Sequence, residues 1–201
     1  MNTEKKKIGT REITTIGMLG AIATVLMQLE IPLWFAPPFY KMDLSEVPVL
    51  ISCFAMGPIA GMLTELVKIL LDFLISGTMT AGVGEVANFC IGCSFCIPAG
   101  IIYHKMKTKK GAIVGLVSGT LIMTFLGCFI NAYIMLPTYA KALPMPIDAL
   151  IEMGTKVNAS ITDLFTFVMF AVVPFNLLKG ILVSIVVLLI YKKISPIIKR
   201  H

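Results

Sequence analysis

The chain has 201 residues, of which 57% are hydrophobic and only 14% are charged, and its mean hydropathy is +0.91. Soluble domains carry about 25% charged residues, so this composition excludes an ordinary soluble protein and predicts a single integral membrane domain, residues 1–201. The formal net charge of +6 does not indicate a nucleic-acid-binding protein, because the Lys and Arg residues lie beside apolar segments rather than on one basic face.

The first apolar segment, residues 13–33, follows a basic start, which is the charge pattern of a secretory signal peptide. The segment is nevertheless about as long as a full membrane span, and no small-residue cleavage pattern closes it. We therefore expect a retained first transmembrane helix.

Five further apolar segments follow along the chain. Their expected bounds are 44–56, 58–76, 83–103, 111–137 and 160–191. The segment 44–56 reaches only roughly 20 Å, against a hydrocarbon core of about 30 Å, so merging it with its successor would give five crossings instead of six. If the two are separate, Gly57-Pro58 forms the turn between them. Asp43 is the expected N-cap of the second helix, with Glu46 as its partner in a capping box.

Three basic clusters decide between five and six crossings. They are Lys5, Lys6, Lys7 and Arg11; Lys105, Lys107, Lys109 and Lys110; and Lys192, Lys193, Lys199 and Arg200. Six crossings place all three clusters in the cytoplasm, as the positive-inside rule requires, whereas five crossings place two of them outside. The sequence therefore predicts an all-α, polytopic membrane protein with six transmembrane helices and both termini in the cytoplasm.

Costly polar side chains occur at similar depth in four of these spans, toward the outer face. They are Asp72 in 58–76, Glu85 and Asn88 in 83–103, Asn131 in 111–137, and Asn176 and Lys179 in 160–191. Polar groups that face lipid without compensation carry a heavy penalty. We therefore expect the spans to share a polar cavity that opens to the exterior. Pro174 is expected to disturb the last helix beside this cavity, because proline frees a backbone carbonyl.

The charged residues of the spans allow two interpretations. Glu65, Lys68 and Asp72 lie three and four residues apart, so they can form a structural ion-pair cluster as readily as a binding site. Lys179 has no acid one turn away on its own helix, so its partner must come from another helix or from a ligand. We favour the ligand, in which case loss of Lys179 would leave the ligand-free protein no less stable.

The outer loop 34–43 and the cysteines carry weaker signals. The loop holds the aromatic residues Trp34, Phe35, Phe39 and Tyr40, which suit either an interfacial belt or a lid above the cavity. Cys90, Cys93 and Cys96 have part of a ferredoxin spacing but lack its fourth cysteine, so we expect packing residues. The sequence contains no phosphate-binding loop, zinc-protease motif or nucleophile elbow, so we expect no ATP use by this chain, no catalytic residue, no metal and no cofactor.

Five stretches together resemble the riboflavin-specific S component of energy-coupling-factor (ECF) vitamin transporters, over residues 13–195. They read FYKMDLSEVPVLI, GPIAGMLTELVKILLDF, GVGEVANF, NAYIMLPTY and PFNLLKG. The resemblance implies a six-helix subunit in a bacterial cytoplasmic membrane that captures riboflavin from outside. It also implies three partners, namely one transmembrane coupling subunit and two cytoplasmic ATPase subunits.

The resemblance also implies roles for individual residues. The loop 34–43 would cover the bound vitamin, and polar residues of the last two spans would hydrogen-bond it. The predicted ligand-binding set is Lys179, Asn176, Asn131, Glu85, Asn88, Asp72, Tyr40 and Met42. Family members often dock through an Ala-x-x-x-Ala face on the first helix, and small residues four apart let helices approach closely. The predicted coupling-subunit contacts are Gly17, Gly20, Ala21 and Thr24.

Three other functions compete with this one. An S component for another vitamin would have the same architecture. A stand-alone secondary carrier would be expected to show two related halves, and the sequence has no such symmetry. A structural membrane protein without a ligand would leave the polar residues of four spans unexplained.

Overall fold

The computed structural model describes residues 9–34, 37, 40–78, 80–142 and 146–199, with side chains through 191 and at 193. The elements in chain order are α1 (Thr10–Gln28), β1 (Ile31–Pro32), β2 (Lys41–Met42), α2 (Glu46–Met56), α3 (Pro58–Ser76), α4 (Val83–Met106), α5 (Lys109–Ile130), the π-helix η1 (Asn131–Met135), α6 (Leu136–Ala142), α7 (Ile147–Val157), α8 (Leu164–Phe167), the π-helix η2 (Val168–Val172) and α9 (Val173–Lys199). The chain is therefore mostly helical, and its one sheet within the described residues is the two-stranded β1–β2 pair.

Three helices within the described residues are long and apolar enough to cross a membrane on length and composition alone. They span Val83–Met106, Lys109–Ala142 and Leu164–Tyr191. The second of these comprises α5, η1 and α6, and the third is α8, η2 and most of α9. The helix α2 is apolar but short, and α3 carries the three charged residues Glu65, Lys68 and Asp72.

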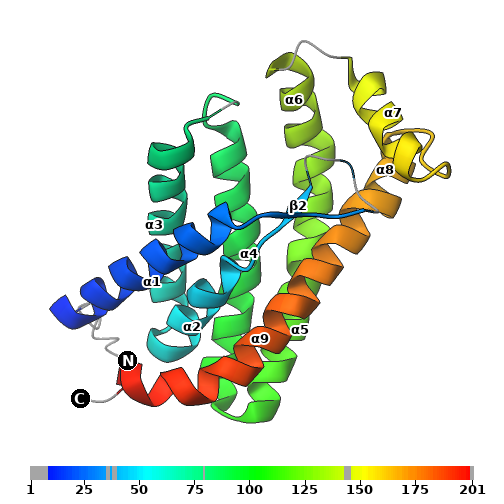
Figure 1. Ribbon diagram of the computed structural model, residues 1–201. Helices are drawn as coiled ribbons and strands as arrows, with labels where there is room; N and C mark the ends of the chain where they lie inside the picture. The colour runs from blue at the N-terminus through cyan, green and yellow to red at the C-terminus, as the bar shows by residue number, and fades with distance from the viewer. Residues whose placement is uncertain (1–8, 35–36, 38–39, 79, 143–145, 200–201) are drawn as a thin grey trace, which may run out of the picture.

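The helix α2 lies at the centre of the bundle, where it contacts α1, α3, α4 and α9. Val49, Leu50, Cys53 and Phe54 on this helix are fully buried. Figure 1 shows the α2–α3 turn, the α4–α5 turn and the end of α9 toward one end of the bundle, with the α3–α4 loop, α6 and α7 toward the other. The basic residues of the α4–α5 turn and the end of α9 therefore share one end of the molecule, while Lys5, Lys6, Lys7 and Arg200 lie outside the described residues.

Most of the predicted segment bounds agree with the structure. The segment 58–76 coincides with α3, and 44–56 and 83–103 match α2 and α4 to within three residues. Gly57 forms the expected turn at φ +117°, a region that favours glycine, and Pro58 follows as the first residue of α3.

The expected end of the first segment was wrong. The first segment was expected to continue to residue 33, but α1 ends at Gln28, and Ile31–Pro32 pairs antiparallel with Lys41–Met42. Proline at position 32 cannot extend the helical hydrogen-bond ladder, which favours the edge strand instead. The connection between α6 and α8 contains the helix α7, whose buried face has the helical spacing 150, 151 and 154.

The expected irregularity at Pro174 takes the form of a π-helix. Proline has no N–H to donate to the carbonyl one turn earlier, and the preceding residues adopt the wider π-helical register as η2. The second π-helix, η1, begins at Asn131, directly after α5. Both irregular turns therefore border the same region of the bundle, at the level where the polar residues gather.

Candidate functional site

A polar cavity of about 390 Å³ lies between the end of α3, the start of α4, η1, the start of α9 and the residues around the β1–β2 pair. Seven of the eight predicted ligand-binding residues line it. They are Lys179, Asn176, Asn131, Glu85, Asn88, Asp72 and Tyr40. The exception is Met42, which points into the protein interior with 4% of its surface exposed, since successive strand residues face opposite sides.

The cavity also has lining residues that the sequence analysis missed. Met135 and Tyr139 follow Asn131 at intervals of four residues, and Phe175 precedes Asn176. The sequence could have indicated Met135 and Tyr139, because residues four apart along one helix share a face with Asn131. The rings of Tyr40 and Phe175 lie 5.1 Å apart between centroids and form an aromatic part of the wall.

Two carboxamides, those of Asn131 and Asn176, lie where the helix formed by α5, η1 and α6 packs against the helix formed by α8, η2 and α9. Asn131 Oδ1 accepts a hydrogen bond from Tyr40 Oη at 2.8 Å, and Asn131 Nδ2 donates to the carbonyl of Gly127 at 2.8 Å. Asn176 Nδ2 donates to the carbonyl of Val172 at 2.9 Å. Gly127 packs closely against Asn176, since a Cβ at this position would lie 3.2 Å from the Asn176 carboxamide. Both amides line the cavity.

Lys179 finds its partner on another segment, as one of the two sequence-based options allowed. Its Nζ lies 2.9 Å from Asp43 Oδ2, and the side chains are 13% and 10% exposed. Burial alone would raise the pKa of Asp43, but the positive charges of Lys179 and Lys68 outweigh this effect and lower the pKa to about 2. The pair therefore remains charged at neutral pH.

This arrangement corrects the predicted capping box. The N-cap of α2 is Ser45, without a side-chain capping bond, and the Ser45 N–H donates to Asp43 Oδ1 at 2.8 Å. Glu46 points instead to Lys68. Asp43 thus accepts a backbone hydrogen bond just before α2 with one oxygen and pairs with Lys179 through the other. An uncompensated buried ammonium costs more free energy than an uncapped helix end, so the ion pair decides the position of Asp43.

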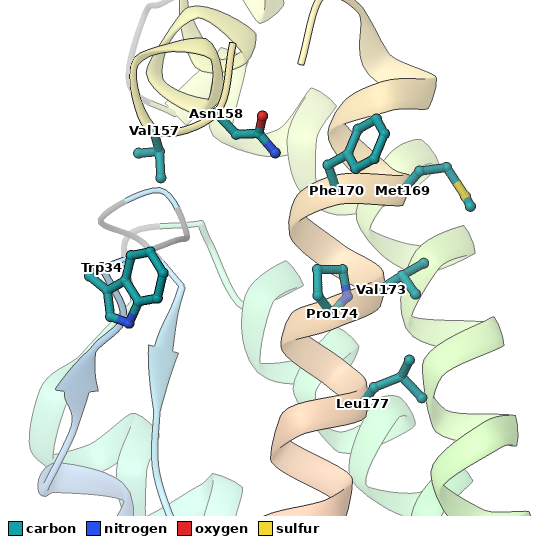
Figure 2. A pocket seen from close by; sticks show the side chains of 8 residues that line it. All are labelled: Trp34, Val157, Asn158, Met169, Phe170, Val173, Pro174 and Leu177. Atoms are coloured by element: carbon teal, nitrogen blue, oxygen red, sulfur yellow. The ribbon is translucent and has the colours of Figure 1, made fainter. Parts of the chain in front are cut away.

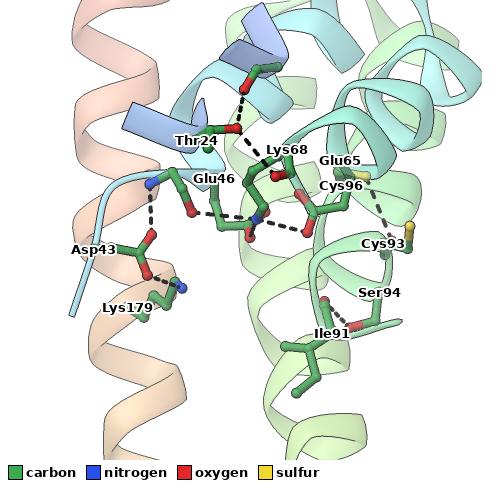
Figure 3. A network of polar contacts seen from close by, with 12 residues as sticks. Thr24, Asp43, Glu46, Glu65, Lys68, Ile91, Cys93, Ser94, Cys96 and Lys179 are labelled. Carbon is green, nitrogen blue, oxygen red and sulfur yellow. Dashed lines mark hydrogen bonds and ion pairs between the residues drawn. The ribbon is translucent and has the colours of Figure 1, made fainter. Parts of the chain in front are cut away.

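A second ion-pair cluster lies deeper in the bundle (Figure 3). Lys68 Nζ lies 2.7 Å from Glu46 Oε1 and 2.8 Å from Glu65 Oε1, and the three side chains are at most 3% exposed. The structural cluster considered for α3 therefore exists, with Glu46 in place of Asp72. Asp72 Oδ1 accepts hydrogen bonds from Gln28 Nε2 at 2.6 Å and from the Ser76 hydroxyl at 3.1 Å, at the edge of the cavity.

Acidic groups dominate the remaining polar lining. Glu85 lines the cavity, and its Oε2 is buried without a hydrogen-bond partner among the described residues. Glu30 and Lys41, both also in the lining, form a half-exposed ion pair between the α1–β1 connection and β2. The cavity therefore offers carboxamides, carboxylates and the two ammonium groups of Lys41 and Lys179 around an aromatic wall, which suits a neutral ligand rich in donors and acceptors.

The small residues of α1 separate into two faces. Gly20 and Thr24 are buried against α3, where the Thr24 hydroxyl donates to the Lys68 carbonyl at 3.2 Å. A Cβ at Gly20 would come within 2.5 Å of Val67. The prediction that Gly20 and Thr24 contact another subunit is therefore wrong, since both hold α1 against α3. Ala21 is exposed, and a Cβ on Gly17 would meet nothing within 4 Å, so this second face is accessible.

A second hollow of about 560 Å³ lies outside the polar cavity (Figure 2). Its lining is mostly apolar and comes from Trp34, the end of α7, η2 and α9. Trp34 is 90% exposed, which agrees with an interfacial aromatic belt, whereas Tyr40 is buried and lines the polar cavity. Phe35 and Phe39 lie outside the described residues.

Of the three cysteines expected to be packing residues, Cys93 and Cys96 are buried, whereas Cys90 is exposed. Cys53 and Cys96 belong to the buried core, and the Cys53 thiol donates to the Cys96 carbonyl at 3.0 Å. Among the described residues, no group of three or more His, Cys, Asp or Glu side chains is arranged to hold a metal ion.

Long apolar helices with a polar cavity between their outer ends are typical of membrane proteins that hold small ligands. The chain belongs to the family described as "ECF transporter, substrate-specific component", whose profile matches residues 11–191. The resemblance found in the sequence is thereby confirmed at the level of the family.

Curated relatives and a solved structure agree with this assignment. The chain is 36% identical over 190 residues to riboflavin transporter RibU of Staphylococcus aureus (strain TCH60), covering 94% of this chain and 93% of that protein. It is 36% identical over 192 residues to riboflavin transporter FmnP of Bacillus subtilis (strain 168), covering 95% of each. A structure described as "Structure and mechanism of the S component of a bacterial ECF transporter" matches with a TM-score of 0.72 and 36% identity, over 94% of this chain and 98% of that one.

Proposed function

We propose that this chain is the riboflavin-binding subunit of an ECF-type vitamin transporter, which captures the vitamin from outside a bacterial cell. The observation that carries the proposal is the convergence of Asn131, Asn176, Lys179 and Tyr40 on one cavity. These residues come from three separate segments of the chain. The names of the curated relatives point to the same vitamin.

The chemistry of the cavity suits a flavin. Riboflavin is uncharged at neutral pH and combines a flat ring system, whose edge carries carbonyl acceptors, with a hydroxyl-rich chain. The aromatic wall of Tyr40 and Phe175 matches the ring, and carboxamides provide both donors and acceptors for its edge. Lys179 supplies an ammonium to a carbonyl, while Glu85 offers an acceptor for hydroxyl groups.

Purification of the protein tests the proposal directly. We expect a yellow preparation that absorbs as a flavin, and quenching of riboflavin fluorescence when the vitamin is added to stripped protein. Melting-temperature measurements with a panel of other vitamins provide the comparison. Stabilisation by another vitamin and none by riboflavin would overturn the assignment in favour of a different S component.

The proposed topology has six crossings, with both termini in the cytoplasm. It is supported by the basic residues of the α4–α5 turn and the end of α9, which lie at the same end of the bundle (Figure 1). In a variant without its native cysteines, Lys107→Cys should react with an impermeant thiol reagent only in opened cells. Ser160→Cys, in the α7–α8 connection, should react in intact cells and is the matched control. Labelling of position 107 from outside would rule out this topology.

The exposed face of α1 is the proposed contact with the transmembrane coupling subunit. Two ATPase subunits would supply the energy, in keeping with the absence of a phosphate-binding loop from this sequence. A stand-alone secondary carrier would instead transport riboflavin without these partners. Uptake in cells with and without a co-expressed coupling module distinguishes the two functions.

Neighbouring substitutions on α1 should separate docking from folding. Ala21→Trp should abolish uptake in cells and leave vitamin binding intact, because Ala21 is exposed and a bulky ring prevents close helix approach. Gly20→Val should instead destabilise the isolated protein by roughly 1–3 kcal/mol, because the added atoms overlap Val67. Uptake, binding and melting temperature of both variants provide the measurement. Loss of binding in Ala21→Trp would show that this face serves the fold.

A further inference from the structure

The ion-pair cluster around Lys68 contains one more acid than base. Lys68 Nζ contacts Glu46 Oε1 and Glu65 Oε1, so two carboxylates share one ammonium. If both carboxylates were ionised, the cluster would carry a net charge of −1 in a region with almost no solvent exposure. The adjacent pair of Asp43 and Lys179 is neutral as a whole, and it does not offset this charge.

The surroundings give Glu65 little to stabilise a negative charge. Its side chain is fully buried, and neither carboxyl oxygen has a hydrogen-bond donor among the described residues apart from the ion pair with Lys68. The carboxyl group packs against Gly92 of α4, so closely that a Cβ there would lie 2.3 Å from Oε1. A carboxylate without compensation in a low-dielectric interior takes up a proton, because the charged form is poorly solvated there.

Glu46 is better placed than Glu65 to stay ionised. It is the first residue of α2, where the partial positive charge of the helix N-terminus favours an anion. It also accepts a hydrogen bond from Lys68 Nζ at 2.7 Å. Glu65 lies at a similar distance from Lys68 Nζ, 2.8 Å, but it is in the middle of α3 and has no helix N-terminus beside it.

We infer that Glu46 and Glu65 form a proton-binding site that holds one proton at neutral pH, carried by Glu65. The proton comes from water and forms an O–H bond to a carboxylate oxygen of Glu65, which makes the cluster neutral. The other charged or titratable groups around Glu65 are Glu46 from the start of α2, Lys68 from α3, Lys179 from α9 and the Cys93 thiol from α4. Asp43 lies next to this cluster as the partner of Lys179.

Hydrogen bonds and an ion pair connect the proton site to Lys179 in the lining of the polar cavity. Lys68 Nζ lies 3.4 Å from the Ser45 hydroxyl, and the Ser45 N–H donates to Asp43, which pairs with the cavity-lining Lys179. Loss of the proton would therefore place a new negative charge beside the groups that position Lys179. The inference does not depend on riboflavin being the ligand, since the proton site exists in the ligand-free protein.

Infrared spectroscopy of the ligand-free protein tests the site. At neutral pH the wild type should show the C=O stretching band of one buried carboxylic acid, shifted in D₂O. Glu65→Gln and Glu46→Gln should each remove this band, because the remaining carboxylate then pairs alone with Lys68. Glu152→Gln, an exposed residue of α7, is the matched control and should leave the band unchanged. Absence of the band in the wild type, or its survival in both cluster variants, would overturn the proposal.

Thermal melting gives an independent readout. Because the folded state keeps a proton that the unfolded chain has already lost, raising the pH should destabilise the wild type relative to Glu65→Gln. The difference in melting temperature should therefore move in favour of Glu65→Gln as the pH rises. A difference that does not change with pH would contradict the proposal. So would stabilisation of the wild type by sodium but not by choline, which would indicate a metal cation in place of the proton.

Discussion

Replacement of Lys179 by methionine should lower both the stability of the ligand-free protein and its affinity for riboflavin. Loss of one partner of a buried pair leaves the other charge uncompensated, and Asp43 lies 2.9 Å from Lys179 with only 10% of its side chain exposed. Since the pair borders a cavity that water can enter, we expect a cost of about 2–3 kcal/mol, seen as a fall of roughly 5–10 °C in melting temperature.

The affinity should fall by roughly one to two decades in the same variant. A hydrogen bond from an ammonium to a ligand acceptor is worth about 1.5–3 kcal/mol, which corresponds to that change in the dissociation constant. Fluorescence titration with riboflavin provides the measurement. The sequence-based expectation that loss of Lys179 would not reduce stability is corrected here, because the structure supplies the acid that the sequence did not reveal.

A second substitution separates the two effects. In the double variant Asp43→Asn with Lys179→Met, no unpaired charge remains, so the melting temperature should recover most of its loss. The affinity should stay low, because the ammonium that faces the ligand is still absent. Recovery of both quantities would mean that Lys179 acts only by holding Asp43. A single variant as stable as the wild type would mean that the ion pair contributes nothing to the fold.

Replacement of Asn131 by leucine should weaken riboflavin binding by roughly tenfold to a hundredfold. The carboxamide accepts from Tyr40 and donates to the Gly127 carbonyl, so it is held rigidly in the cavity wall. Leucine has a similar size but neither donates nor accepts, and one or two lost hydrogen bonds of about 1 kcal/mol each, together with the displaced Tyr40, account for the change. The measurement is again fluorescence titration.

Two further variants provide controls for Asn131. Tyr40→Phe removes the hydroxyl that orients the Asn131 carboxamide, and it should cause a smaller loss of affinity, about tenfold or less. Asn158→Leu removes a carboxamide of the second, mostly apolar hollow, which is separate from the polar cavity, and should leave the affinity unchanged. Equal effects of Asn131→Leu and Asn158→Leu would point to a general disturbance of the bundle and against a specific contact.

The sequence by itself determined the class of the protein, most of its helices and most of the cavity. Apolar segments separated by basic clusters define helices in a membrane, because unpaired backbone groups and loop charges are costly in lipid. Polar residues inside such segments are rare for the same reason, so the sequence alone singles out Asn131, Asn176 and Lys179. The family resemblance then connected these residues to one ligand class.

Only the tertiary structure decided the partners of these groups. Asp43 and Lys179 are 136 residues apart in the chain, and Glu46 meets Lys68 across two helices, so no local spacing predicted either pair. Both faces of α1 carry small residues four apart, and only the contact with α3 showed that Gly20 and Thr24 are internal while Ala21 is exposed. A local pattern fixes which side chains cannot face lipid, whereas the choice of the charge or surface that each one meets depends on how the helices pack together.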